Sequence, residues 1–491
     1  MKKIINAILL SMLSVVGAFA GDYGKYYSDL PLKLSAPVAP SIPDYEVNIR
    51  DFGGVSDGVT LNTDAFARAI SHLEEKGGGK LTIPSGLWLT GPITLGNNIN
   101  LHAELGAFVL FTDDLAAYPL VESSFEGLMV KRCQAPITAV GKHDVAITGQ
   151  GIFNGNGQAW RAVKRSKTTE PQWKKLVAGG GVVGNKGNTW YPNQYIAFGN
   201  QNPADRDPKL AADPQFMAAV DHDFSRPNMV VIRDCDNVLL QGVTFENSPA
   251  WNVHPLLVRN LIVDGVNIRN PWYAQNGDGI DVESCSDVLI INTTFDVGDD
   301  AICLKSGKDK PGRDRGIPTE RVLVDGCTVY HGHGGFVIGS EMSGGVKDVV
   351  CNNCVFDGTD AGLRFKSGRD RGGVVENIFV DGIYMYNIAG NAIIFNMYYG
   401  NGRAIDANGN PIPDGSDAKP VANEGTPQFR DFVINNVFCN GAVSAGEIKG
   451  LPEMPIKNVR MNNVVIRADR PLTQEYYENV DLSGFRYIPA K

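Results

Sequence analysis

Short strand-like segments dominate the chain from about residue 80 onward, and they take two recurring forms. The first has the outline x-Asn/Asp-Val-x-Val/Ile-x-Gly/Asn and occurs at 233–248, 258–270, 285–296, 319–330, 375–387, 429–440 and 456–467. The second is a shorter alternation of apolar and other residues, at 279–284, 301–306, 335–340, 362–367 and 392–397. Two strand types that alternate with turns, without helices between them, are typical of a parallel β-solenoid, whereas a β-sandwich would not show this paired register.

The second form also predicts which side chains face the core. Alternate residues of a strand point to opposite faces, so the apolar positions should point inward. These positions are Ile280, Val282, Ile302, Leu304, Phe336, Ile338, Leu363, Phe365, Ile393 and Phe395. The intervening positions should point outward, and they are Asp281, Glu283, Cys303, Lys305, Val337, Gly339, Arg364, Lys366, Ile394 and Asn396.

One segment near the N-terminus has helical periodicity. Phe66, Ala69, Ile70 and Leu73 follow helical spacing, with Thr63 able to cap the start and Gly77 able to end the helix. It is the only convincing helix in the sequence. We therefore expect an all-β fold, a right-handed parallel β-helix whose N-terminal end is covered by this short helix.

The remaining segments divide the chain. Residues 1–20 resemble a signal peptide, with Lys2 and Lys3, an apolar run, and a small-x-small ending. Residues 21–45 are Pro-rich and predict an extended arm, and residues 46–491 predict a single β-helix domain. An aromatic-bearing excursion at 158–228 interrupts the repeats. We expect an exported protein, periplasmic or secreted, without a membrane anchor.

Composition and charge narrow the class of partner. The net charge of −9 argues against nucleic acid, although a local cluster of Lys and Arg could still bind an acidic substrate. Eight Cys are present, but no second CxxC or His pair stands at zinc-finger spacing beside Cys351 and Cys354. Buried thiols are the favoured interpretation, and export leaves disulfides open.

Three acids precede equivalent strands of successive coils. Asp278 and Asp300 each lie two residues before the first inward position of a coil, and Asp299 lies beside Asp300. Since neighbouring strands lie about 4.8 Å apart, the three carboxylates should gather at one turn. His333 occupies the position equivalent to Asp299 in the following coil.

Two cations follow on the same face. Arg364 and Lys366 point outward one coil beyond His333, where they suit a sugar that carries a carboxylate. Crowded carboxylates raise one another's pKa, which favours one protonated donor and one ionised partner, the pair that glycoside cleavage needs. A Ca²⁺ site is the rival explanation for the acids, and turn or surface roles are open for each residue alone.

Four motifs in order resemble the polygalacturonase family, glycoside hydrolase family 28, whose motifs are Asn-Thr-Asp, Asp-Asp, Gly-His-Gly and Arg-Ile-Lys. Here they are Asn276-Gly277-Asp278, Gly298-Asp299-Asp300, Gly332-His333-Gly334 and Arg364-Phe365-Lys366. The likeness covers about residues 46–470 and departs at Gly277 and Phe365.

The resemblance implies roles for single residues. Asp299 would be the general acid, Asp278 and Asp300 would activate water, and His333 would tune the protonation of the acid. Substrate would be bound by Asn276, Arg364, Lys366 and Tyr399, the last favoured over Tyr398 by its spacing. Family members invert configuration, whereas the close stacking of coils would by itself suggest a retaining enzyme, since inverters usually separate their carboxyls by about 6.5–9.5 Å.

The expected activity is hydrolysis of α-linked galacturonate in pectin, without cofactor or metal, by a monomer. The excursion could close one end of the groove, which favours an exo-acting enzyme over an endo-acting one. A basic loop at 306–319 could bind a further uronate, although solvated charge is its default interpretation. Alternatives are a hydrolase of galacturonate alternating with rhamnose, a pectate lyase, and a non-catalytic polysaccharide-binding solenoid.

Overall fold

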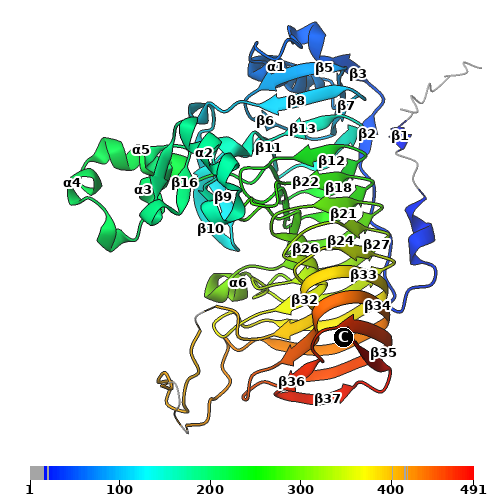
Figure 1. Cartoon of the computed structure of the whole chain (residues 1–491). Helices are drawn as coiled ribbons and strands as arrows, with labels where there is room; N and C mark the ends of the chain where they lie inside the picture. The colour runs from blue at the N-terminus through cyan, green and yellow to red at the C-terminus, as the bar shows by residue number, and fades with distance from the viewer. Residues whose placement is uncertain (1–15, 19–21, 401, 414–415, 417, 491) are drawn as a thin grey trace, which may run out of the picture.

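The computed structural model describes residues 16–18, 22–400, 402–413, 416 and 418–490. Successive coils stack along one axis, and each coil contributes a strand to up to three parallel rows (Figure 1). The predicted parallel β-helix is therefore confirmed. Apart from residues 16–18, the predicted signal peptide lies outside the described residues.

The strands of each row pair in parallel with the next coil. Row A contains β6 Ile93–Thr94, β11 Ile137–Val140, β17 Val230–Arg233, β20 Val253–Leu256, β23 Ile280–Glu283, β26 Asp300–Lys305, β29 Gly334–Ile338 and β32 Leu363–Lys366. Row B contains β3 Glu46–Asn48, β4 Gly79–Ile83, β7 Ile99–Ala103, β12 His143–Gly149, β18 Asp236–Gln241, β21 Arg259–Asp264, β24 Ser286–Ile291, β27 Thr319–Asp325 and β30 Val346–Asn352. Row C contains β5 Gly86–Thr90, β8 Ala107–Phe111, β13 Ile152–Asn154, β19 Thr244–Glu246, β22 Asn267–Arg269, β25 Thr294–Asp296, β28 Thr328–Val329 and β31 Val355–Asp357.

Long strands replace separate short ones in the C-terminal coils. The strand β33, Val374–Asn396, pairs along its length with strands of rows B, C and A in turn. The remaining strands of this end are β34 Gln428–Lys449, β35 Ile456–Ala468, β36 Thr473–Glu475, β37 Tyr477–Asp481 and β38 Phe485–Pro489. Each segment of the predicted first form thus carries the chain through rows B and C, and each segment of the second form lies in row A.

The register confirms the predicted inward positions. Ile280 pairs with Ile302, Ile302 with Phe336, and Phe336 with Leu363, so one ladder of apolar side chains runs along the axis. All ten residues predicted to face inward are buried in the main core. Burial of such ladders in every coil is the main favourable term for a solenoid.

The helix α1, Thr63–Glu75, covers the N-terminal end of this core, as predicted. Phe66, Ala69, Ile70 and Leu73 are buried in the same cluster as the first strands of the stack. The expected capping residue was off by one, because Asn62 occupies the N-cap position.

The predicted arm lies along the outside of row B. It holds a 3₁₀ turn, η1 Tyr23–Tyr27, and the strand β2 Ser41–Pro43, which pairs with β1 Val16–Ala18. Tyr23 and Ile42 are buried against an outward-facing apolar stripe. The stripe consists of Ala146, Leu239, Ile262, Leu289, Leu323 and Val350, one from each coil.

The prediction of a single helix is wrong, because the excursion folds into a mostly helical lobe that projects from the β-helix (Figure 1). Its helices are α2 Glu170–Ala178, α3 Gln194–Gly199, α4 Pro208–Ala211 and α5 Pro214–Phe224, and its strands are β14 Val163–Lys164, β15 Val182–Gly184 and β16 Thr189–Tyr191. A hairpin of β9 Leu120–Phe125 and β10 Leu128–Cys133 adjoins it. A sixth helix, α6 Asp309–Arg315, forms in the basic loop.

All eight Cys are buried free thiols, in agreement with the favoured interpretation. Among the described residues no helix is both long enough and apolar enough to span a bilayer.

Candidate active site

Three carboxylates meet at the N-terminal ends of two row A strands. Asp278 lies just before β23, and Asp299 and Asp300 lie at the start of β26. One carboxylate oxygen from each lies within 4.8 Å of the others. The expected gathering is therefore observed, and the separation is smaller than inverting glycosidases usually show.

The neighbouring coils supply one His and two cations. His333 Nδ1 lies 3.0 Å from Asp299 Oδ1. Lys366 Nζ donates to Asp300 Oδ2 at 2.6 Å, and Arg364 Nη1 donates to Asp300 Oδ1 at 3.0 Å. His333 thus contacts Asp299, and Asp300 is held between two cations. Among the described residues, Asp278 joins the cluster by proximity alone, and its Oδ1 has no hydrogen-bond partner.

The surroundings separate the protonation states of these groups. Burial, together with the charges of Asp281 and Asp299, raises the pKa of Asp278 well above its ordinary value. Burial would also raise the pKa of Asp300, but Lys366 and Arg364 outweigh it and hold that pKa well below the usual range. One carboxyl is therefore biased toward its neutral form and another toward its ionised form, a division on which acid–base chemistry depends.

The third group with a shifted pKa is His333. The hydrogen bond to Asp299 raises the pKa of His333, and although burial opposes this effect, the charges of Asp299 and Asp300 reinforce it. The imidazolium therefore persists to a higher pH than in a free histidine.

Further charges lie beneath the acids at the outward positions of row A. Lys305 Nζ is 2.9 Å from Glu341 and 3.5 Å from Asp281, and it lies 4.9 Å from the centroid of the Trp251 ring. Asp281 and Lys305 point away from the core, as predicted, yet both are buried. The sequence pattern gave their facing but no sign of the side chains that cover them.

A second buried pair extends this layer. Glu283 accepts from Arg315 at 2.5 Å and lies 2.9 Å from His254 Nε2. His254 packs edge-on against Trp251. Since a buried charge is costly unless it is paired, these contacts explain how row A tolerates so many ionisable groups.

Asn276 is positioned by an arginine that the sequence did not reveal. Arg226, which follows α5 at the end of the lobe, donates to Asn276 Oδ1 at 2.7 Å and to the Gln275 carbonyl at 2.9 Å. Burial lowers the pKa of Arg226 to about 10, which leaves it charged beside Asp278 and Asp299. Fifty residues separate Arg226 from Asn276, and no motif links them.

The departure at Gly277 has a local explanation. A Cβ at this position would lie 2.7 Å from Ala274 Cβ and 2.9 Å from the Ala274 carbonyl oxygen. A Thr at position 277 would therefore clash with Ala274 in this chain. Phe365, the other departure, is buried in the core, as its inward position predicted.

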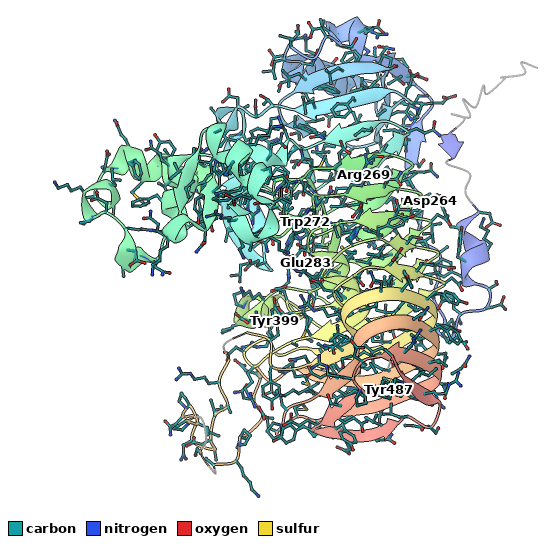
Figure 2. The ribbon with its side chains drawn as sticks, viewed as in Figure 1. Asp264, Arg269, Trp272, Glu283, Tyr399 and Tyr487 are labelled. Atoms are coloured by element: carbon teal, nitrogen blue, oxygen red, sulfur yellow. The ribbon has the colours of Figure 1, made fainter. Side chains whose placement is uncertain are left out.

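Tyr399 lies beside the cations, as its spacing suggested. Lys366 Nζ is 4.9 Å from the centroid of the Tyr399 ring, and the tyrosine is 44% exposed. Figure 2 places Tyr399 toward the C-terminal coils and Trp272 near the lobe, with Glu283 between them. Tyr398 instead lies against Arg369 and Lys449.

The basic loop does not present free charge to a substrate. Its four cations each pair with an acid: Lys308 with Glu126, Lys310 with Asp314, Arg313 with Glu424, and Arg315 with Glu283. The default interpretation, in which these charges have a structural or solvated role, therefore fits the contacts better than a uronate clasp.

The aromatic residues of the excursion mostly form the interior of the lobe. Trp160, Trp173 and Tyr191 are buried there. The lobe reaches the acids instead through Lys164 and Lys167, which line a cavity of about 240 Å³ together with Asp299 and His333.

Comparisons with known proteins agree with this geometry. Residues 218–416 match the model of the family described as glycosyl hydrolases family 28. The solved structure of a hyperthermoactive exopolygalacturonase from Thermotoga maritima is 32% identical, with a TM-score of 0.71, over 90% of this chain and 94% of that one. The chain belongs to glycosyl hydrolases family 28. Two further relatives are a Vitis vinifera sequence named "Probable polygalacturonase", 29% identical over 90% of this chain and 78% of its own, and an exo-poly-alpha-D-galacturonosidase from Dickeya chrysanthemi, 27% identical over 90% and 71%.

Proposed function

We propose that this chain is an exo-acting hydrolase of α-linked galacturonate in pectic polysaccharides or oligogalacturonides. The observation that carries the proposal is the contact of Arg364 and Lys366 with Asp300, inside a cluster of three carboxylates. Carboxylates supply the acid and the base of glycoside cleavage, and the cations suit a sugar that bears a carboxylate of its own.

The proposed roles follow exposure and contacts. Asp299, whose side chain is 21% exposed and whose carboxylate touches His333, is the general acid that protonates the leaving oxygen. Asp278 and Asp300 hold and activate the attacking water. Arg364, Lys366, Asn276 and Tyr399 bind the substrate next to the cleaved bond.

Inversion remains part of the proposal, although the carboxyls are close together. A single displacement by water requires room for that water between base and sugar, and close carboxyls favour a covalent intermediate instead. NMR of the first-formed product decides the point, because retention of the anomeric configuration would rule out the single displacement.

The rival explanations make different products or need a metal. A pectate lyase would generate unsaturated product with new ultraviolet absorbance and would lose activity to a chelator, and we expect neither. A calcium site would need the oxygens of Asp300 that Lys366 and Arg364 already occupy. A binding-only solenoid would have no use for three carboxylates gathered within 4.8 Å of one another.

Product analysis on two substrates tests the proposal. Polygalacturonate should yield small galacturonides, whereas oligomers in which galacturonate alternates with rhamnose should be cleaved much more slowly. Cleavage of the alternating backbone alone would move the assignment to a rhamnogalacturonan hydrolase. No cleavage of either substrate would refute the hydrolase.

Export and monomeric state belong to the same proposal. Pectic polymers lie outside the cells that degrade them, and residues 1–20 resemble a signal peptide. We propose a single catalytic domain from residue 46 onward that acts in the periplasm or medium. Mass spectrometry of the exported chain should find its N-terminus near Gly21, and light scattering should give the monomer mass.

A further inference from the structure

A cationic cavity lies beside the candidate acids, where the lobe approaches the turns of Asp299 and His333. Its volume is about 240 Å³. Its walls come from the lobe, from the loop between β22 and β23, and from the acid and His turns. Its lining includes Lys164, Lys167, Trp272, Asn276, Asp299 and His333.

The two lysines differ from the other cations around the site. Arg364, Lys366, Lys305 and the cations of the basic loop are all paired with carboxylates. Arg226 donates to Asn276 and to the Gln275 carbonyl. Among the described residues, no carboxylate oxygen lies within 4.0 Å of the ammonium group of Lys164 or Lys167. Lys167 Nζ instead lies 5.3 Å from the centroid of the Trp272 ring. Their positive charge is therefore available to an anion in the cavity.

Trp272 supplies a second kind of contact. It is 53% exposed, although tryptophan is among the side chains that gain most from burial. Tyr273 supports it edge-on, with ring centroids 6.1 Å apart. A broad exposed ring next to two unpaired ammonium groups suits a ligand that has an apolar face and a carboxylate, as a uronate ring has.

The stacking of coils sets the distance between this cavity and the other cations. The turn that carries Asn276 and Asp278 precedes the Arg364 strand by three coils. At about 4.8 Å per coil, this places Asn276, in the wall of the cavity, about 14 Å along the axis from the Arg364 strand, with the turns of Asp299 and His333 between them. Figure 2 shows the same order, with Trp272 and Tyr399 on opposite sides of Glu283.

We propose that Lys164, Lys167 and Trp272 form a subsite for an unesterified uronate, on the lobe side of the bond that is cleaved. The proposal rests on the proposed function and deepens it. In this proposal the lobe binds the carboxylate of the substrate and also closes one end of the site. The lysines bind the carboxylate and Trp272 packs against the sugar ring. A methyl ester at this unit removes the negative charge and should weaken binding.

The test compares matched oligogalacturonides, one fully acidic and one methyl-esterified at a terminal unit. With wild type, we expect the KM to be about tenfold higher for the ester placed at the lobe end. The double variant Lys164→Ala/Lys167→Ala should raise the KM for the acidic oligomer to the ester level, with little change in kcat, and should no longer discriminate. Trp272→Ala should raise the KM for both oligomers, and Trp272→Phe should restore part of the loss.

Lys174→Ala is the matched control, since it removes an exposed lysine of the same lobe at α2 without touching the cavity. It should leave both KM values unchanged. The subsite is refuted if the double variant keeps the wild-type KM, or if it loses the same factor on acid and ester.

Binding separates this inference from the proposed function. If wild type hydrolyses no pectic substrate, the proposed function fails, and calorimetry with trigalacturonate still tests the subsite. A Kd that rises about tenfold in the double variant and not in Lys174→Ala supports the subsite. Equal Kd values in all three proteins refute it.

Discussion

At the residue scale, the roles proposed for Asp299 and Asp278 can be separated by the choice of substrate. Asp278 has the raised pKa, whereas Asp299 has the exposure and the His333 contact. If Asp299 is the acid, Asp299→Asn should lower kcat on oligogalacturonides by about 10²–10⁴-fold. An aryl galacturonide with a good leaving group needs no proton, so the same variant should recover much of its rate there.

Asp278→Asn should behave differently, because an unactivated water limits both substrates. Its rate should fall on oligogalacturonides and on the aryl galacturonide alike. Asp296→Asn serves as the control. Asp296 lies three residues before Asp299 and pairs with His331 instead of with the acids. Recovery on the aryl substrate by Asp278→Asn instead would exchange the two roles.

His333 should set the alkaline limit of activity. Its pKa is raised, so the imidazolium beside Asp299 is present at low pH and is lost as pH rises through that pKa. The activity of wild type should therefore fall at a pH above the ordinary histidine value of about 6.5. His333→Gln keeps a hydrogen-bond donor without the charge, and its kcat/KM profile should lack this limb; an unchanged profile would exclude the role.

The sequence predicted that these acids and cations gather because each coil has a regular length and register. Asp278, Asp300 and Arg364 stand at matched positions of a repeating register, which strand spacing converts into proximity. Arg226 and Lys167 could not be predicted in this way, because the lobe that carries them lies outside the repeat. Only its tertiary path returns these cations to the acids.

At the scale of elements, the arm acts as a strap over row B. Ile42 is 4% exposed against the apolar stripe, whereas Val38 of the same arm is 58% exposed. Ile42→Ala should lower the free energy of unfolding by about 1–3 kcal/mol, and Val38→Ala should change it by no more than about 0.5 kcal/mol. Calorimetric melting of both variants measures the difference, and equal melting temperatures would mean that the arm does not contribute to stability.

The helices of the lobe show where periodicity fails and local signals would have served. They are short, and α2 buries only Trp173, so no apolar face of helical spacing stands out. The sequence nevertheless carries local signals for the starts of two of these helices. Asp207 and Asp213 each occupy the N-cap position of a helix whose first residue is Pro. An N-cap Asp followed by Pro favours a helix start.

At the scale of the molecule, the chain combines a repeating segment pattern with one insertion that does not repeat. The repeat encodes the solenoid, since each coil buries the same ladder of apolar side chains against its neighbours. The lobe interrupts the repeat between β13 and β17 and folds around aromatic residues of its own. A regular scaffold thus supplies the acids, and an irregular insertion lines the cavity beside them.

If the proposed function is right, the mode of cleavage depends on the lobe and the chemistry depends on the coils. If the lobe closes the groove beside Asp299, the chain must enter by its end. Polygalacturonate should then gain reducing ends well before its viscosity falls, and reducing-end-labelled oligomers should shorten stepwise from the unlabelled end. A rapid fall in viscosity with products of intermediate length would show internal cleavage. It would refute the closed end while leaving the roles of Asp278, Asp299 and Asp300 intact, because those residues belong to the coils.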